Sequence, residues 1–232
     1  MSTTTFVKHY ASQSRAESAR AHHDWLLGLD TPVRIPQMRE LTGTRMVLEH
    51  LEGRQPGPAD LPVVAAALGD LHTAAYTRHL HTWPLDQPYE ATTTLRLVDF
   101  VTPRATVLPP DFAIAELPCA LYKDSNIRNF ILIDDDVAII DFDDLTLAPF
   151  GYDLAKLVVS AAMTHGPLTC DLVEDTLNRY NTQTTGIANA HCDIHQLRLY
   201  TEIHHRLTSR YLGRHGYTYD WPTVRPRGWQ PS

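Results

Sequence analysis

The stretch from Ala120 to Asp144, ALYKDSNIRNFILIDDDVAIIDFDD, most constrains what this chain can fold into. Two short apolar runs, FILI and VAII, flank three consecutive aspartates, and three more aspartates follow the second run. Apolar runs of this length that are separated by turn-forming residues predict a β-hairpin with residues 134–136 at its tip. Carboxylates are costly beside buried strands unless they reach water or bind a cation. The hairpin is therefore expected to hold acidic side chains at its edge.

The size and charge of the chain exclude several classes of protein. Its 232 residues are enough for one large domain or two small ones. Its net charge of −7, from 20 basic and 27 acidic residues, disfavours nucleic-acid binding, which needs a basic face. No apolar segment reaches the length of a signal-peptide core or a membrane span, so no membrane partner is expected. Three scattered cysteines predict reduced thiols and a cytoplasmic protein.

The first quarter of the chain predicts a small β-rich lobe. The sequence TTFVKHY favours a strand at about residues 4–10, and Ser14 is expected to cap a helix that runs to about Leu27. MRELTGTRMVLEHLEG predicts two strands joined at Thr42-Gly43. The segment GRQPGPADLP contains two glycines and three prolines and is typical of a linker between lobes.

The rest of the chain predicts a mostly helical lobe around the hairpin. Helices are expected from Leu61 to about Leu80, at about 91–101, from Gly151 onward and near 193–213. Asp153 falls in the first turn of the third of these helices, where a carboxylate suits a structural cap. The predicted fold class is therefore α+β, with a small β-rich lobe, a linker and a larger helical lobe.

The acidic residues around the hairpin match the needs of phosphoryl transfer. That reaction requires a group that positions and deprotonates the acceptor hydroxyl, and oxygen ligands for a metal ion on the phosphates. Asp124 precedes Asn129 by five positions, and Asp141 follows the second apolar run. We expect Asp124 to act as the catalytic base, and Asn129 and Asp141 to hold Mg²⁺.

The same residues resemble the aminoglycoside phosphotransferase and choline kinase family. The similarity lies in Asp124-x-x-x-x-Asn129, the hairpin, Ile140-Asp141-Phe142 and YDLA, with weaker matches in PVRIP, MVLEHLEG and LGDLH. It covers about residues 5–160, and Tyr122 stands where the family usually has a histidine. The resemblance implies a protein-kinase-like two-lobed fold that uses ATP and Mg²⁺. It places a truncated N-terminal lobe at residues 1–53 and a helical C-terminal lobe at residues 54–232.

The resemblance also implies residues that bind the nucleotide. Lys8 would contact the phosphates, and Glu17 on the following helix would pair with Lys8. Counting back from PVRIP instead puts the family's glutamate nearer residues 19–21, which are Ala, Arg and Ala, so another partner for Lys8 stays open. Backbone groups at Glu49, His50 and Leu51 would meet the adenine.

The chain departs from the family pattern at its N-terminus. Only seven residues precede Lys8 and none is glycine, whereas family members have two strands and a phosphate-covering loop there. We therefore expect weak binding of ATP, with an affinity on the order of 0.1–1 mM. A partner protein that completes the small lobe, or the acceptor itself, is expected to tighten it.

Two functions from different classes follow. The first is an ATP-dependent phosphotransferase that acts on a hydroxyl of a small molecule, such as an aminoglycoside-like or other natural product, or on Ser or Thr of a natural-product precursor peptide. The alternative is a catalytically inactive kinase-like binding module, or a subunit that needs a partner to complete its nucleotide site. Retention of all three chemical residues favours the first.

Other polar clusters have simpler interpretations. Asp134–Asp136 are expected to form a solvated turn, and Asp143 and Asp144 to be solvated loop residues, one of which could instead assist a metal. His191, Cys192 and His195 have spacing found in zinc sites, but the sequence offers no closed set of four ligands.

Overall fold

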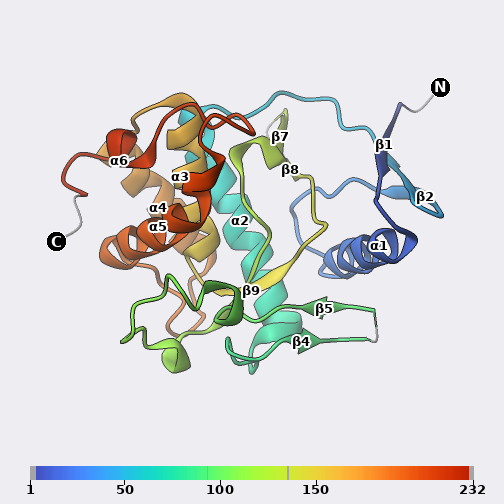
Figure 1. Cartoon of the computed structure of the whole chain (residues 1–232), viewed down its shortest axis with the longest axis horizontal. Helices are drawn as coiled ribbons and strands as arrows, with labels where there is room; N and C mark the ends of the chain where they lie inside the picture. The colour runs from blue at the N-terminus through green and yellow to red at the C-terminus, as the bar shows by residue number, and fades with distance from the viewer. Residues whose placement is uncertain (1–3, 93, 135, 230–232) are drawn as a thin grey trace.

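A computed structural model of the protein describes residues 4–92, 94–134 and 136–229. Figure 1 shows a small antiparallel sheet with one helix on one side of the molecule, and most of the helices on the other. The sheet has the order β1-β3-β2, so both outer strands pair with β3. The elements of this part are β1 (Thr5–His9), α1 (Gln13–Leu27), β2 (Met38–Thr42) and β3 (Arg45–Glu49). The expected strands and helix of the first quarter are therefore present.

Helix α1 begins earlier than the sequence predicted. Its N-cap is Ser12, which has an extended backbone and whose side-chain oxygen accepts a hydrogen bond from the backbone N–H of Arg15, 3.2 Å away. The prediction that Ser14 is the cap was wrong, because Ser14 already lies within the first turn. Ser12 and Ser14 are both suitable cap residues, and the helix begins at the one nearer to the end of β1, which is Ser12.

The predicted hairpin is present and joins the two sides of the molecule. Strands β7 (Phe130–Ile133) and β8 (Asp136–Ile139) pair in antiparallel register, and Asp135 at the tip lies outside the described residues. Arg34 forms a parallel bridge to β8, and Arg54 forms an antiparallel bridge to β7. The chain approaches β7 so closely before Arg54 that a Cβ at Gly53 would collide with the carbonyl oxygen of Leu132. The segment before β2 and the segment after β3 thus both form backbone bridges to the hairpin.

Two described α-helices of the helical part, at residues 170–183 and 221–224, were not predicted from the sequence. The elements are η1 (Pro58–Asp60), α2 (Leu61–Ala75), the π-helix η2 (Tyr76–Leu80), α3 (Tyr152–His165), α4 (Cys170–Gln183), α5 (Ile194–Thr208), η6 (Ser209–Tyr211) and α6 (Trp221–Val224). Helix α4 was missed because it is largely polar and its apolar stripe is narrow. The predicted helix near 193–213 is shorter, since α5 ends at Thr208 and one 3₁₀ turn follows.

The prediction of a helix at about 91–101 was wrong. Apart from residue 93, which lies outside the described residues, this segment forms a turn and part of a two-stranded sheet. The Thr92 side-chain oxygen accepts a hydrogen bond from the backbone N–H of Leu95, 3.0 Å away, which favours a turn over a helix. The remaining elements are β4 (Tyr89–Glu90), β5 (Arg96–Leu97), η3 (Thr102–Arg104), η4 (Ile114–Glu116), β6 (Cys119–Tyr122), η5 (Ile127–Asn129) and β9 (Thr146–Pro149).

The core of the helical part is built where α2 passes close to α4. Gly69 on α2 lies against α4, so that a Cβ there would be 2.8 Å from Cβ of Gln183 and 2.9 Å from the carbonyl oxygen of Tyr180. Glycine is therefore used for close packing, at the cost of helix propensity. None of the described helices is long and apolar enough to cross a membrane.

We expect Gly69→Ala to lower the free energy of unfolding by about 1–3 kcal/mol, because the added methyl group overpacks the contact between α2 and α4. Helix propensity alone gives the opposite sign, about 1 kcal/mol of stabilisation. Chemical denaturation measures the change. Gly57→Ala is the control, since the atom nearest to its new Cβ is 3.9 Å away. A more stable Gly69→Ala protein would contradict this account of the packing.

Candidate active site

The loop that carries Asp124 is held by a buried carboxylate. Asp153 lies in the first turn of α3 and is fully buried, and its two side-chain oxygens accept hydrogen bonds from the backbone N–H groups of Lys123 (3.0 Å) and Ser125 (2.9 Å). The predicted role of Asp153 as a helix cap was wrong, because its carboxylate reaches across to this loop. Asp124, between the two donors, has a left-handed backbone with φ of 64°. Asp153 thus fixes an unusual turn that exposes the Asp124 side chain.

The charge of Asp153 is stabilised in its buried position. Burial alone would raise the pKa of this carboxyl, but the His72 imidazole, the Lys123 ammonium and the Lys123 backbone N–H lower it below its usual value. Nε2 of His72 lies 3.7 Å from the carboxylate. The Asp153 anion is therefore the form that the fold requires.

Asp124 opens into a cavity of about 490 Å³ on the helical side. Its carboxylate lies 3.1 Å from Nζ of Lys156 and accepts a hydrogen bond from the Tyr122 hydroxyl, also 3.1 Å away. Lys156 is nearly buried and donates to the Tyr217 hydroxyl at 2.9 Å. Burial lowers the pKa of Lys156, but Asp124 and Tyr217 outweigh it and raise that pKa above its usual value. A charged lysine therefore holds the Asp124 side chain in place.

Asn129 and Asp141 lie in a second cavity, on the other side of the same loop. This cleft of about 390 Å³ lies between the small sheet and the hairpin. The Asn129 side-chain amide donates to the backbone oxygen of Asp124 at 3.2 Å, and the backbone oxygen of Asn129 accepts from the N–H of Ile140 at 3.0 Å. Asp141 also has a left-handed backbone, with φ of 64°. These contacts bring Asp124, Asn129 and Asp141 together, as their spacing in the sequence suggested.

Lys8 crosses from β1 to the acidic segment that follows the hairpin. Its Nζ lies 2.5 Å from the Asp141 carboxylate and 2.6 Å from that of Asp143. Burial lowers the pKa of Lys8, but the two carboxylates outweigh it and raise the pKa above its usual value. Tyr10, also on the small lobe, donates to Asp143 at 3.0 Å. Tyr10 was not singled out in the sequence, and Asp143 was expected to be solvated. The contacts of Asp143 with Lys8 and Tyr10 each span more than 130 positions of the chain, so no local pattern indicates them.

The expected pair between Lys8 and Glu17 is not formed. Glu17 is exposed on α1 and accepts a hydrogen bond from the Gln13 side chain at 2.8 Å, while Lys8 pairs with Asp141 and Asp143. Helix α1 contributes Arg15 to this region instead, since its guanidinium lies 2.5 Å from Asp144. The small lobe therefore contacts the acidic segment through basic side chains from both β1 and α1.

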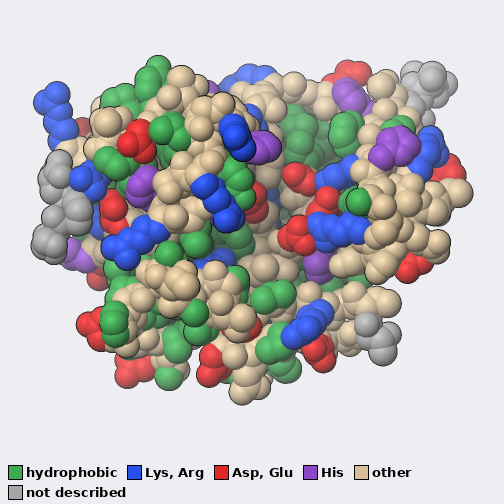
Figure 2. Space-filling view, in the orientation of Figure 1, with side chains coloured by type: hydrophobic (Ala, Val, Ile, Leu, Met, Phe, Trp, Pro, Cys, Tyr) green, Lys and Arg blue, Asp and Glu red, His purple; other side chains and the backbone are tan. Residues whose placement is uncertain are grey.

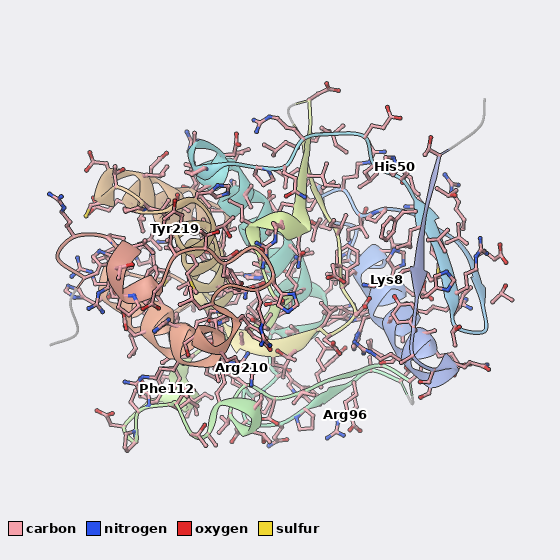
Figure 3. The ribbon with its side chains drawn as sticks, turned by 45° about the horizontal axis from the view of Figure 1, so that its top comes forward. Lys8, His50, Arg96, Phe112, Arg210 and Tyr219 are labelled. Carbon is pink, nitrogen blue, oxygen red and sulfur yellow. The ribbon has the colours of Figure 1, made fainter. Side chains whose placement is uncertain are left out.

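Glu49, at the end of β3, and the two residues after it line the cleft. Figure 3 shows Lys8 and His50 between the small sheet and the rest of the molecule. The backbone N–H of His50 donates to Thr4 at 3.3 Å, and the Glu49 carboxylate accepts from Arg34 at 2.7 Å and from the N–H of Gln37 at 3.1 Å. Leu51 contributes an apolar wall. The cleft thus combines apolar walls at this end with charged groups at the Lys8 end.

The donor set in the cleft suits a hard cation that brings further ligands with it. Asn129, Asp141 and Asp143 offer amide and carboxylate oxygens, which Mg²⁺ prefers. Among the described residues, no group of three or more His, Cys, Asp or Glu side chains could hold a metal ion by itself, and this includes the histidines near residue 191. Phosphate oxygens of a bound nucleotide would supply the missing ligands. The residues therefore fit a metal–nucleotide pair better than a metal alone.

A sequence model described as the phosphotransferase enzyme family (APH) matches residues 2–191. The chain belongs to this family. Its enzyme class is therefore phosphotransferase, with a hydroxyl group as acceptor. None of the curated proteins compared with the chain matches it.

Several solved structures share the fold of this family member at low sequence identity. The amicoumacin kinase hAmiN, in complex with AMP-PNP, Ca²⁺ and Ami, is 13% identical, with a TM-score of 0.56 over 90% of this chain and 74% of the other. Choline kinase LicA from Streptococcus pneumoniae is 13% identical, with a TM-score of 0.56 over 90% and 76%. Macrolide 2'-phosphotransferase MphH from Brachybacterium faecium is 14% identical, with a TM-score of 0.56 over 90% and 78%. The protein-kinase-like fold class is thereby confirmed.

We expect Asp153→Asn to lower the free energy of unfolding by about 2–4 kcal/mol at neutral pH, because it removes a buried charge that two backbone donors require. The folded-state pKa of Asp153 is depressed, so its contribution is present above the unfolded value and is lost as the pH falls through the folded value. The difference between the two proteins should therefore shrink in acid, as chemical denaturation at several pH values would measure. Asp175→Asn, on exposed α4 surface, is the control and should change stability by less than about 0.5 kcal/mol.

Proposed function

We propose that this phosphotransferase transfers the γ-phosphoryl group of ATP to a hydroxyl of a small molecule, or of Ser or Thr in a precursor peptide. One observation carries the proposal. A single loop presents Asp124 to one cavity and Asn129 to another, and Asp141, which follows β8, lines the second cavity beside Asn129. A donor and an acceptor that bind in separate cavities and meet at one loop are what an in-line displacement needs.

On the acceptor side, Asp124 positions the hydroxyl and takes its proton. Tyr122 and Lys156 contact the Asp124 carboxylate, each at 3.1 Å, and restrict its orientation. The Lys156 ammonium lies beside the Asp124 carboxylate that takes the proton of the hydroxyl. The second role of this lysine is to stabilise the negative charge that the hydroxyl develops as it attacks.

On the donor side, the cleft binds the nucleotide along its length. The apolar walls near Leu51 and Met46 take the base, and Lys8 contacts the phosphates from β1. Asn129 and Asp141 would hold Mg²⁺, which would supply positive charge to offset that of the transferred phosphoryl group. The Lys8 ammonium exchanges the carboxylates of Asp141 and Asp143 for phosphate oxygens as the nucleotide enters.

The lobe boundary and a partner protein belong to the same proposal. Residues 1–53 form the nucleotide-side lobe and residues 54–232 the acceptor-side lobe. Within the described residues, β1 pairs only with β3, and Phe6 on it is 51% exposed. An edge strand with exposed apolar side chains can pair with another strand. A partner that adds a strand here would cover the phosphate end of the cleft, so weak ATP binding by the chain alone and its tightening by a partner stay predictions.

We expect Asp124→Asn to reduce phosphoryl transfer by about 10²–10⁴-fold, because the amide cannot accept the proton of the hydroxyl. Asparagine tolerates the left-handed backbone at this position, so the fold and nucleotide binding should be preserved. The measurement is release of ADP with an accepted substrate, beside calorimetry with ATP. Asp111→Asn, an exposed change, is the control. Near-normal transfer by Asp124→Asn would remove Asp124 from the mechanism. Nucleotide binding without transfer by the natural sequence, with any acceptor, would favour the binding-module alternative.

We expect Asp141→Asn to weaken the binding of Mg²⁺–ATP by more than about tenfold and the binding of adenosine much less, because the lost charge faces the metal and phosphates rather than the base. Calorimetric titration of both ligands measures the contrast. Asp134→Asn is a close control, since Asp134 is exposed and also has positive φ, 52°. An equal loss for both ligands would mean that Asp141 supports the shape of the cleft rather than the metal.

A further inference from the structure

The cavity that contains Asp124 is rich in cations. Figure 2 shows basic side chains gathered over the face on which the C-terminal helices lie, and Figure 3 labels Arg210 at the end of this segment. Among the described residues that line the cavity, Asp124 is the sole carboxylate. The basic and imidazole side chains are Arg104, Lys156, His204, Arg210 and His215. Since Lys156 neutralises Asp124, the two arginines leave the cavity with net positive charge.

Arg104 is the most unusual of these side chains. It is 4% exposed, and its guanidinium lies over the rings of Phe100, Tyr122 and Tyr152 at 4.5, 5.1 and 4.8 Å from their centroids. One guanidinium nitrogen donates to the backbone oxygen of Phe100 at 3.0 Å, while Nε has no hydrogen-bond partner among the described atoms. None of the ion pairs between described residues includes Arg104. A buried guanidinium without a carboxylate is costly unless an anion joins it.

His204 lies next to this charge and has no partner of its own. It is 3% exposed, and neither ring nitrogen has a hydrogen-bond partner among the described atoms. Burial lowers the pKa of His204 well below its usual value, and Lys156 and Arg104 lower it further. The imidazole is therefore neutral and can donate one hydrogen bond to a ligand. Two buried groups on one wall, Arg104 and His204, thus present unsatisfied donors.

We propose that the acceptor taken by this cavity carries an anionic group, such as a carboxylate or a phosphate, in addition to its hydroxyl. This inference rests on the proposed function, because it assigns the cavity to the acceptor. Arg104 and His204 bind the anionic group, and Arg210 attracts it at the rim. A polycationic acceptor is disfavoured, because the two arginines would repel its amines. Asp124 is the single carboxylate in the described lining that could attract the amines.

The geometry also sets where the anionic group lies in the acceptor. The Arg104 guanidinium rests against the ring of Tyr122, and the hydroxyl of that ring reaches Asp124. The Tyr122 side chain therefore contacts both groups, with the guanidinium over its ring and the Asp124 carboxylate at its hydroxyl. From this placement we expect the acid and the hydroxyl to be on different carbons of the acceptor. The acceptor has several bonds between its hydroxyl and its acid.

Binding of three matched compounds tests this inference without ATP. 6-Hydroxyhexanoate, 6-hydroxyhexanamide and 6-aminohexan-1-ol have similar length and a hydroxyl, and differ in the charge of the other end. In a buffer without phosphate or sulfate, titration followed by NMR should show the carboxylate binding at least about tenfold more tightly than the amide, with the amine weakest. Equal binding of carboxylate and amide, or tighter binding of the amine, would overturn the inference.

Matched variants locate the site. Arg104→Met removes the buried charge and should abolish the preference for the carboxylate. Arg210 is exposed, so Arg210→Gln should fold normally and provides the test if Arg104→Met does not fold. Arg210→Gln should weaken binding of the carboxylate compound about three- to tenfold and leave binding of the amide compound unchanged. Arg206→Gln, an exposed arginine on α5 outside the cavity lining, is the control. Loss of carboxylate binding in Lys8→Met instead, with Arg210→Gln unchanged, would place the anion in the nucleotide cleft and overturn the inference.

Phosphoryl transfer to the same compounds separates this inference from the proposed function. Transfer to the carboxylate, with little to the amide and none to the amine, supports both. Transfer to the amine or amide in preference to the carboxylate leaves the phosphotransferase intact and overturns the anionic acceptor. Selective, Arg210-dependent binding of the carboxylate without transfer to any compound supports the anion site and counts against ATP-dependent transfer. Phosphorylated analogues of the same chain length distinguish a phosphate from a carboxylate as the preferred anion.

Discussion

The buried carboxylate of Asp153 is the interaction on which the rest of the site depends. It belongs to a helix of the core, yet both of its oxygens bind backbone N–H groups of the loop that carries Asp124. Those donors lie on either side of Asp124, whose backbone is left-handed, so the Asp153 carboxylate holds this turn in one conformation. The helical core therefore keeps the turn in place. The position of Asp124 relative to the hairpin therefore depends on contacts with the helical core as well as on the sequence of the loop.

The loop separates two environments with different preferences for charge. In the proposed nucleotide cleft, Asp141 and Asp143 share the single positive charge of Lys8, so one negative charge is left for a further cation. On the acceptor side, Asp124 is already neutralised by Lys156, and the charge that remains is positive. Under the proposed function, aspartates on one side of the loop bind a cation, and Asp124 on the other side accepts a proton. Their different neighbours, rather than their own chemistry, assign the roles.

The sequence predicted those features that depend on local patterns, and it missed those that depend on distant neighbours. The hairpin was predicted from two apolar runs and a turn. The proximity of Asp124, Asn129 and Asp141 was predicted from their spacing in the sequence. The pair between Lys8 and Asp143 could not be predicted, since it joins segments far apart in the chain. Arg104 escaped notice because its proline-rich surroundings suggest a loop, where an arginine is normally exposed. Helix α4 was missed because it is largely polar, and the few buried side chains that pack it against α2 do not stand out in the sequence.

The left-handed backbone at Asp124 and Asp141 has a consequence for how this protein can change over generations. Asp, Asn and Gly accept that conformation at low cost, whereas most other side chains do not. Asn and Gly codons are each one nucleotide from an Asp codon. The easiest mutations at these positions are therefore those that remove the carboxylate and leave the fold intact. Under the proposed roles of Asp124 and Asp141, one such mutation removes catalysis and leaves a stably folded protein.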